Sequence, residues 1–206
     1  MKVLMINGSP EEHGCTYTAL SEVGMTLEKH GIQTRIHWIG TKPVQGCVNC
    51  GKCAETGKCA FNDQVNDAAE LLDQSDALVV GSPVYYGSAS GQVTALLDRL
   101  FFSACDRFAG KPAAAVVSCR RGGATATFDQ LNKYFALCNM PIVTSQYWNQ
   151  VHGFTPEDVR QDIEGLQTMR TLGENMAWLL KCIEAGKAAG IPAPGYEDVI
   201  MTNFVR

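Results

Sequence analysis

The sequence lacks the charge and the long hydrophobic runs that would suit it to nucleic acid or to a membrane. Lys and Arg number 17 and Asp and Glu number 21, so the net charge of −4 gives no electrostatic reason to expect a polyanionic partner. No apolar run approaches the length that spans a bilayer, and only four apolar residues follow Lys2, too few for a signal peptide. We therefore expect a cytoplasmic protein with no nucleic-acid or membrane partner.

Two common nucleotide-binding fingerprints are also missing. The sequence contains neither G-x-x-x-x-G-K-[ST] nor G-x-G-x-x-G. It has no internal repeat, no shift of composition that would mark a second domain, and no convincing pair of acid–base residues. Its 206 residues are 46% apolar, which is enough for a full core, and we expect one domain over residues 1–206.

The features that are present are organised around the first stretch of the chain. Residues 3–6 (Val-Leu-Met-Ile) form an unbroken apolar run that is typical of a strand buried on both faces. A turn at 7–10 and a loop of small and polar residues follow, and a helix is predicted over 16–30. Such a loop suits a phosphate, because the first N–H groups of a helix face outward with partial positive charge. Hydroxyl donors beside these groups come from Ser9, Thr16 and Thr18.

Strands and helices are predicted to alternate along the rest of the chain. Apolar runs predict further strands at 33–38, 76–81, 113–118 and 141–143. Apolar residues at helical spacing predict helices over 64–74, 93–101, 128–138 and 162–186. Five strands alternating with five helices indicate an α/β fold with a doubly wound parallel sheet.

Two later loops lie at predicted strand ends, where open α/β sheets bind ligands. The loop 81–91 places Tyr85-Tyr86 among Gly, Ser and Pro, which favours stacking on a planar ligand over ordinary packing. The loop 119–125 is the only one of the three with positive charge, and its Arg120-Arg121 pair suits either a phosphate or a solvated turn. In residues 146–153, Trp148 and His152 are further candidates to line a site.

Cysteine is abundant, with nine residues and therefore an odd count. Four of them lie in a loop insertion at 40–63 with the spacing C-x2-C-x2-C-x5-C: Cys47, Cys50, Cys53 and Cys59. This compact spacing suits a 4Fe–4S cluster better than zinc, whose ligand pairs are usually separated by a longer spacer. Four reduced thiols in a surface loop are the alternative interpretation.

These motifs together resemble a known family. The segment Met5-Ile6-Asn7-Gly8-Ser9-Pro10 with Gly14-Cys15-Thr16 is similar to the first loop of the flavodoxin-like FMN reductases. The segments Gly81-Ser82-Pro83-Val84-Tyr85-Tyr86-Gly87, Ser90-Gly91-Gln92 and Leu97-Asp98-Arg99 resemble the isoalloxazine loop and helix of the same family. The four-cysteine motif resembles that of the iron–sulfur flavoproteins. The resemblance covers at least residues 1–125 and departs at Cys15, where family members commonly have Asn.

The resemblance implies a flavodoxin-like sheet of strand order 2-1-3-4-5 with FMN at the strand ends. The FMN phosphate would be held by Ser9, Thr16, Tyr17 and Thr18. The ring and the ribityl chain would pass along Pro83, Val84, Tyr85, Tyr86 and Gly87. The other side would be closed by Ser118, Arg120, Gly122 and Gly123. The metal ligands of a 4Fe–4S cluster would be Cys47, Cys50, Cys53 and Cys59. No catalytic residue is required, because the flavin carries the chemistry.

The function that follows is an FMN-dependent oxidoreductase that links NAD(P)H to flavin or quinone-type acceptors, with the cluster relaying electrons. Its partners would be small-molecule or redox-protein electron donors and acceptors. The alternative is a non-enzymatic flavin electron carrier or redox sensor of flavodoxin type. A zinc-stabilised binding module, a third class, would hold metal without flavin.

Assembly is expected because one domain leaves the edge of a flavin at the sheet ends uncovered. We expect a homodimer or homotetramer in which residues 40–60 or 146–153 of one subunit approach the flavin of another. The tail from Gly190 is expected to be extended and to dock on a partner subunit.

Overall fold

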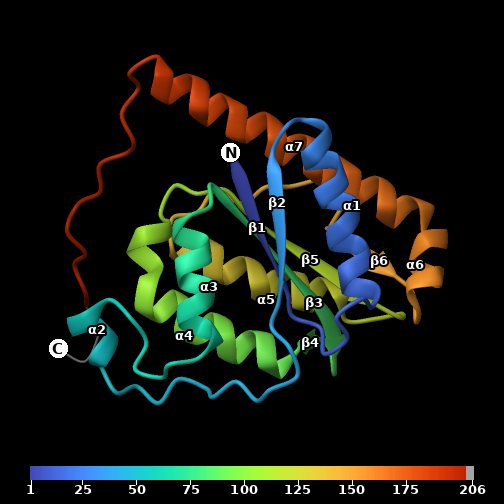
Figure 1. The fold of residues 1–206 in the computed structure, drawn as a ribbon, viewed down its shortest axis with the longest axis horizontal. Helices are drawn as coiled ribbons and strands as arrows, with labels where there is room; N and C mark the ends of the chain where they lie inside the picture. Colours follow the sequence, from blue (N-terminus) through green and yellow to red (C-terminus); the bar gives the residue numbers. More distant parts are fainter. Residues whose placement is uncertain (203–206) are drawn as a thin grey trace.

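The structure is a computed structural model that describes residues 1–202. These residues form a sheet that lies between two layers of helices (Figure 1). The strands are β1 (Lys2–Asn7), β2 (Gln33–Trp38), β3 (Ala77–Tyr85), β4 (Ser88–Ala89), β5 (Ala113–Cys119) and β6 (Gln150–His152). The helices are α1 (Cys15–Lys29), α2 (Lys52–Thr56), α3 (Gln64–Asp73), α4 (Gly91–Phe108), α5 (Ala124–Leu137), α6 (Pro156–Gln161) and α7 (Ile163–Ala188).

The order of the strands across the sheet is β2-β1-β3-β5-β6. All neighbours in this order are parallel, and the two-residue β4 pairs antiparallel with the end of β3. When the five parallel strands alone are numbered along the chain, the order is 2-1-3-4-5. The predicted doubly wound, flavodoxin-like fold is therefore confirmed.

The apolar run of β1 is explained by the two layers that cover the sheet. Val3 and Met5 point into the core beneath α1, α6 and α7, whereas Leu4 and Ile6 point into the core beneath α3, α4 and α5. None of the four is more than 1% exposed. A strand that is covered on both faces has no polar side, so the usual alternation of polar and apolar residues is absent.

Several predicted elements are confirmed with small differences in their bounds. The strand 33–38 is β2, and the helices at 16–30, 64–74 and 162–186 are α1, α3 and α7. Asp63 and Ser90 cap α3 and α4, each accepting a hydrogen bond from a first-turn N–H group. The strand expected to end at Gly81 continues to Tyr85, because Ser82 and Pro83 still pair with β5.

The predicted fifth strand at 141–143 is wrong. That segment makes only an isolated bridge between Ile142 and Ala113, because Pro141 has no N–H group to continue a ladder. The strand that completes the sheet is β6, which pairs with the last residues of β5. Only its central residue, Val151, is apolar and buried, so three residues gave too short a pattern to be recognised.

Other features were not anticipated. The short helix α2 lies within the loop insertion at 40–63, which we call the cysteine segment. The helix α6 precedes α7 and begins with a capping box between Thr155 and Asp158. Cys105 at the end of α4 forms a disulfide with Cys138, which follows α5. Within residues 1–202 the other seven cysteines are free.

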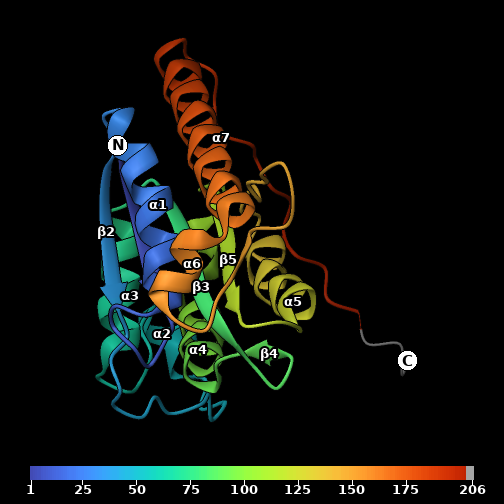
Figure 2. The ribbon, with the colours of Figure 1, turned by 90° about the vertical axis from the view of Figure 1, so that its right-hand side faces the viewer.

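The C-terminal part of α7 projects past the amino end of the sheet, and the chain then turns back alongside the domain (Figure 2). Residues 191–202 are extended and exposed, as predicted for the tail. No helix in the described part of the chain is long and apolar enough to cross a membrane.

Gly81 gives the first testable prediction. An added Cβ there would lie 2.7 Å from the Thr16 side chain and 2.9 Å from that of Leu20. Gly81→Ala should therefore lower the free energy of unfolding by about 1–3 kcal/mol, measured by urea denaturation without added ligand. The matched control is Gly91→Ala, whose Cβ would meet nothing within 4 Å and should leave stability unchanged or slightly raised. Equal losses in the two variants would contradict the packing at Gly81.

Candidate functional site

The carboxyl ends of the parallel strands meet at one edge of the sheet, which we call the carboxyl edge (lower part of Figure 1). The last residues of β1, β3, β5 and β6 are Asn7, Tyr85, Cys119 and His152. The three loops singled out in the sequence all start here. In doubly wound sheets this edge is where ligands bind.

The first loop, residues 8–14, is held by the fully buried side chain of Asn7. Its amide nitrogen donates to the carbonyl of Glu12 at 2.9 Å, and its amide oxygen accepts from the N–H of Ser9 at 3.1 Å. The Ser9 hydroxyl accepts from the N–H of Glu11, and the indole of Trp38 donates to the Ser9 carbonyl at 2.8 Å. The shape of the loop is therefore set from both β1 and β2.

The start of α1 is left open to an anion. Its cap is Gly14, which offers no side chain to the first-turn N–H groups, and α1 has no acidic residue in that turn. Burial and the charge of Glu11 raise the pKa of the Cys15 thiol, so it stays protonated near neutral pH and adds no negative charge here. The thiol donates to the carbonyl of Gly153 at 3.7 Å.

The predicted phosphate residues do not all face solvent. Thr16 is fully buried, and its hydroxyl is bonded to that of Ser118 at 2.8 Å, joining α1 to β5. The Thr18 hydroxyl donates to the carbonyl of Gly14. Tyr17 is half-buried with its ring edge-on to that of His13. The hydroxyls of Thr16 and Thr18 are therefore already used within the protein, and no side chain caps the first-turn N–H groups.

The second loop is a β-hairpin rather than an irregular loop. β3 runs through Pro83 and Val84 to Tyr85, and the turn Tyr86-Gly87 leads back into β4. Both turn residues have positive φ, +52° at Tyr86 and +76° at Gly87, which suits a tight two-residue hairpin. A bulky residue at positive φ is uncommon, and the Tyr86 side chain is fully exposed. The hairpin thus presents two tyrosine rings to the outside, as stacking on a planar ligand requires.

Hydrogen bonds anchor this hairpin at its base. The Gln130 side-chain oxygen accepts from the Ser88 hydroxyl at 2.7 Å and from the Ala89 N–H at 2.9 Å. The Ser90 hydroxyl donates to the carbonyl of Gly8 at 2.7 Å, and the Ser90 N–H donates to the hydroxyl of Ser82. The first loop and the hairpin are therefore fixed to each other and to α5.

The third loop packs directly against the hairpin. Gly123 has a φ of +86°, and a Cβ there would lie 2.8 Å from the Gly87 Cα and 2.9 Å from the Val84 side chain. Gly122, Arg120 and Arg121 are exposed, and neither guanidinium forms an ion pair within residues 1–202. The third loop therefore contacts the hairpin at Gly123, and the two arginine side chains lie exposed beside it.

Of residues 146–153, His152 and Gly153 reach the carboxyl edge at the end of β6, whereas Tyr147 and Trp148 precede that strand. The rings of Tyr147 and Trp148 lie 4.7 Å apart, and both are about half exposed. His152 is exposed and its N–H donates to the Asp162 carboxylate, which also caps α7. This hydrogen bond to Asp162 explains the position of His152.

The four cysteines of the motif line one small cavity together with Phe61, Phe102 and Arg99. Cys47 and Cys50 are exposed, and Cys53 and Cys59 are partly buried. Within residues 1–202, however, no three His, Cys, Asp or Glu side chains gather closely enough to hold a metal ion. The four cysteines therefore line one cavity without gathering at a single point, and their role as metal ligands stays a prediction.

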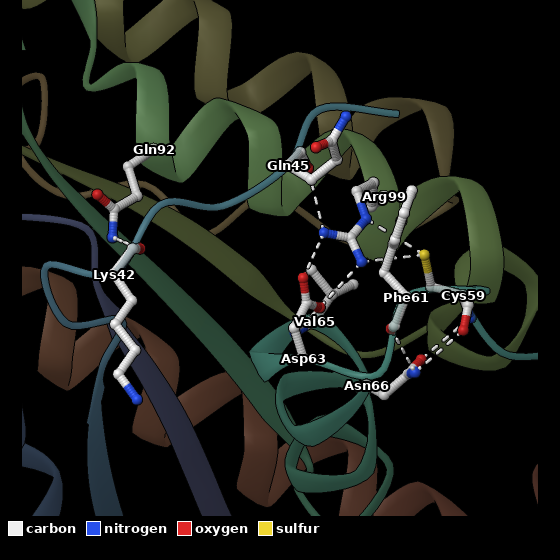
Figure 3. A network of polar contacts seen from close by, with 9 residues as sticks. All are labelled: Lys42, Gln45, Cys59, Phe61, Asp63, Val65, Asn66, Gln92 and Arg99. Carbon is white, nitrogen blue, oxygen red and sulfur yellow. Dashed lines mark hydrogen bonds and ion pairs between the residues drawn. The ribbon is translucent and has the colours of Figure 1, made fainter. Parts of the chain in front are cut away.

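Arg99 is one of the residues that line this cavity, and Figure 3 shows its polar contacts. Its side chain is 1% exposed and reaches from α4 between the cysteine segment and α3. Nη1 and Nη2 donate to the Asp63 carboxylate at 2.7 and 2.9 Å, and Nη1 also donates to the carbonyl of Gln45 at 3.1 Å. Nε and Nη2 both donate to Cys59 Sγ at 3.2 Å. The ring of Phe61 covers the guanidinium at 4.8 Å.

Electrostatics favour a charged guanidinium despite its burial. Burial alone would lower the pKa of Arg99, but its hydrogen bonds to Asp63 and Cys59 outweigh that effect and raise the pKa above its ordinary value. Sequence reasoning used Arg99 only as part of a resemblance. Its position three residues after the buried Leu96, on the apolar stripe of α4, was a signal that could have identified it.

Comparison with known proteins finds a matching family and similar proteins over most of the chain. The sequence model of the family described as NADPH-dependent FMN reductase matches residues 1–155. An iron–sulfur flavoprotein of Methanocaldococcus jannaschii is 32% identical over 194 residues, 89% of this chain and 100% of its own length. An iron–sulfur flavoprotein of Archaeoglobus fulgidus is 27% identical over 88% of this chain and 98% of its own length.

Among solved structures, an NAD(P)H:quinone oxidoreductase from Methanothermobacter marburgensis superposes with a TM-score of 0.65 and 15% sequence identity. The match covers 85% of this chain and 96% of that one. At this identity the likeness concerns the fold alone.

Gln130 gives a prediction about the hairpin. Gln130→Ala removes the acceptor of two hydrogen bonds and should lower the free energy of unfolding by about 1–3 kcal/mol. It should also speed hydrogen exchange at the Ala89 amide. Gln130→Glu keeps an acceptor oxygen and serves as the control. Unchanged exchange at Ala89 in the alanine variant would contradict the anchoring role.

Proposed function

The chain belongs to the NADPH-dependent FMN reductase family, and from this premise we propose that it carries FMN at the carboxyl edge and a 4Fe–4S cluster in the cysteine cavity. An oxidoreductase of this family takes electrons from a nicotinamide donor. In our proposal the acceptors are flavins, quinone-type compounds or redox proteins, and a 4Fe–4S cluster held by Cys47, Cys50, Cys53 and Cys59 would supply single-electron transfer to or from the flavin. The whole chain, 1–206, then acts as one domain with two redox centres.

The carboxyl edge has the groups that FMN requires. The uncapped start of α1 suits the phosphate, because its first-turn N–H groups lack a side-chain partner from the cap. Ser9, Thr16, Tyr17 and Thr18 remain the residues proposed around this group, with Thr16 acting through its bond to Ser118 to hold the start of α1 against β5.

The flavin ring is proposed to lie between the hairpin and the third loop. Pro83, Val84, Tyr85, Tyr86 and Gly87 would border one side, and Ser118, Arg120, Gly122 and Gly123 the other. FMN, when bound, supplies hydride and single-electron chemistry. The protein's own contribution is to orient the ring by the anchored hairpin and to offer positive charge from Arg120 beside it.

The observation that supports the cluster most strongly is the shared cavity of Cys47, Cys50, Cys53 and Cys59. Four thiols are the donor set of a 4Fe–4S centre, and no carboxylate or imidazole lines the cavity as a competing ligand. Apart from Ser103 and Arg99, the rest of the lining is apolar, and the charge of Arg99 complements a centre ligated by thiolates. The donor set therefore fits the cluster, provided that the exposed cysteines move inward on loading.

The alternative of a non-enzymatic carrier or sensor is disfavoured, since the family consists of reductases. Zinc is disfavoured by the compact spacing of the four cysteines. We also propose that the protein is cytoplasmic and forms a homodimer or homotetramer. Exposed Tyr86 and Phe154, which follow β3 and β6 at the carboxyl edge, support an assembly, because a partner subunit would cover them.

Cys50→Ser tests this function in protein purified without oxygen. The variant should lose the iron–sulfur absorbance but keep bound FMN, because the two groups are held by different loops. Reduction of the flavin by NADPH should survive, whereas electron exchange between cluster and flavin should be lost.

The control is Cys182→Ser, which removes an exposed cysteine of α7 far from the cavity and should change none of these properties. Wild-type protein that binds no flavin, or that shows no steady-state turnover with NADPH and a quinone, would contradict the proposed enzyme. Retention of the full iron content by Cys50→Ser would contradict the ligand set.

A further inference from the structure

Arg99 forms hydrogen bonds with only one of the four cysteines of the motif, Cys59. Two of its five N–H groups, on Nε and Nη2, converge on Cys59 Sγ at 3.2 Å each. Two more bind the Asp63 carboxylate and the fifth binds the carbonyl of Gln45. Every donor of the guanidinium is therefore used, and no hydrogen bond from Arg99 reaches Cys47, Cys50 or Cys53.

The position of Arg99 is fixed by α4 and α3 as well as by the cysteine segment. It stands in the middle of α4, between residues that pack in the core, and its carboxylate partner Asp63 is the cap of α3. The Asn66 side chain on α3 adds hydrogen bonds to the N–H and the carbonyl of Cys59 at 3.0 and 3.1 Å (Figure 3). Cys59 is thus held through its backbone and its sulfur, while Cys47 and Cys50 are exposed.

We propose that Arg99 is a positioning residue that holds Cys59 as the preformed ligand and raises the reduction potential of the 4Fe–4S centre through its two N–H···S hydrogen bonds. This inference rests on the proposed cluster. Hydrogen bonds to a ligand sulfur and a nearby positive charge both stabilise the reduced, more negative state, so both raise the potential. The carboxylate of Asp63, which pairs with Arg99, partly offsets that positive charge. Single substitutions of Arg99 or of Asp63 can therefore move the reduction potential in either direction.

Substitutions of Arg99 and of Asp63 should therefore shift the reduction potential of the cluster in opposite directions. Arg99→Lys keeps a charge but loses the paired donors, and Arg99→Gln loses both, so each should move the cluster potential to a more negative value. Asp63→Asn keeps the hydrogen bonds to sulfur and removes a negative charge, so it should move the potential to a more positive value. Asn also remains a good helix cap for α3.

The experiment is a redox titration of the cluster in flavin-loaded protein purified without oxygen, followed by visible absorbance and electron paramagnetic resonance. Arg170→Gln is the matched control, since it removes one arginine charge on α7, across the sheet from the cysteine cavity, and should not shift the potential. If the Arg99 variants do not fold, the direction in which Asp63→Asn shifts the cluster potential still tests the proposal.

The outcomes separate this inference from the function on which it rests. Negative shifts in the Arg99 variants with a positive shift in Asp63→Asn would support it. Iron present at full content with a potential that does not move, or that moves the same way in both sets, would overturn the role of Arg99 and leave the cluster standing. Wild-type protein without iron would overturn the cluster and this inference together.

Discussion

The close approach of β1 and β3 at their carboxyl ends is the constraint on which both sites depend. The N–H of Gly8 donates to the carbonyl of Gly81 at 2.8 Å, and a Cβ on Gly8 would lie 2.7 Å from Val93. A side chain at Gly8 would push the first loop away from α4, and one at Gly81 would press on Thr16 and Leu20 of α1. With the two glycines, the loop, the hairpin and the start of α4 share one hydrogen-bonded junction at Ser90.

From that junction α4 reaches the second site as a rigid element. Ser90 caps the helix at the carboxyl edge, and Arg99 lies about 14 Å further along the axis, at about 1.5 Å of rise per residue. The Gln92 side chain also donates to the carbonyls of Gly40 and Lys42, which ties the approach to the cysteine segment to the same helix (Figure 3). A single helix thus sets the separation of the proposed flavin and the cysteine cavity within one chain.

The sequence was most informative where periodicity reflects the core. The bounds of β1, β2, α1 and α3 agree with the prediction within a few residues, because burial on one or two faces dictates their apolar pattern. The stripe at 93–101 predicts α4 itself but not its continuation to Phe108. β6 was missed because three residues at the edge of the sheet, of which only Val151 is fully buried, leave no such pattern. The hairpin was missed because its turn depends on Tyr86, a residue that sequence rules do not place at positive φ.

The site residues show the same division. Spacing was enough to bring the four cysteines to one cavity, because a short segment cannot carry them far apart. The partner of Cys59 could not be read from the cysteine motif, because Arg99 is 40 residues away along the chain and meets it only through the packing of α3 on α4. Likewise, the bond between Thr16 and Ser118 joins residues that are distant in sequence, and only the parallel order of the strands brings them together.

The most direct test of this account is the content of iron, acid-labile sulfide and flavin in protein purified without oxygen. The account predicts about four iron and four sulfide atoms per chain together with one FMN, since a 4Fe–4S centre needs all four cysteines as ligands. FMN with less than about one iron per chain, and with the four thiols of the motif freely titratable, would contradict it.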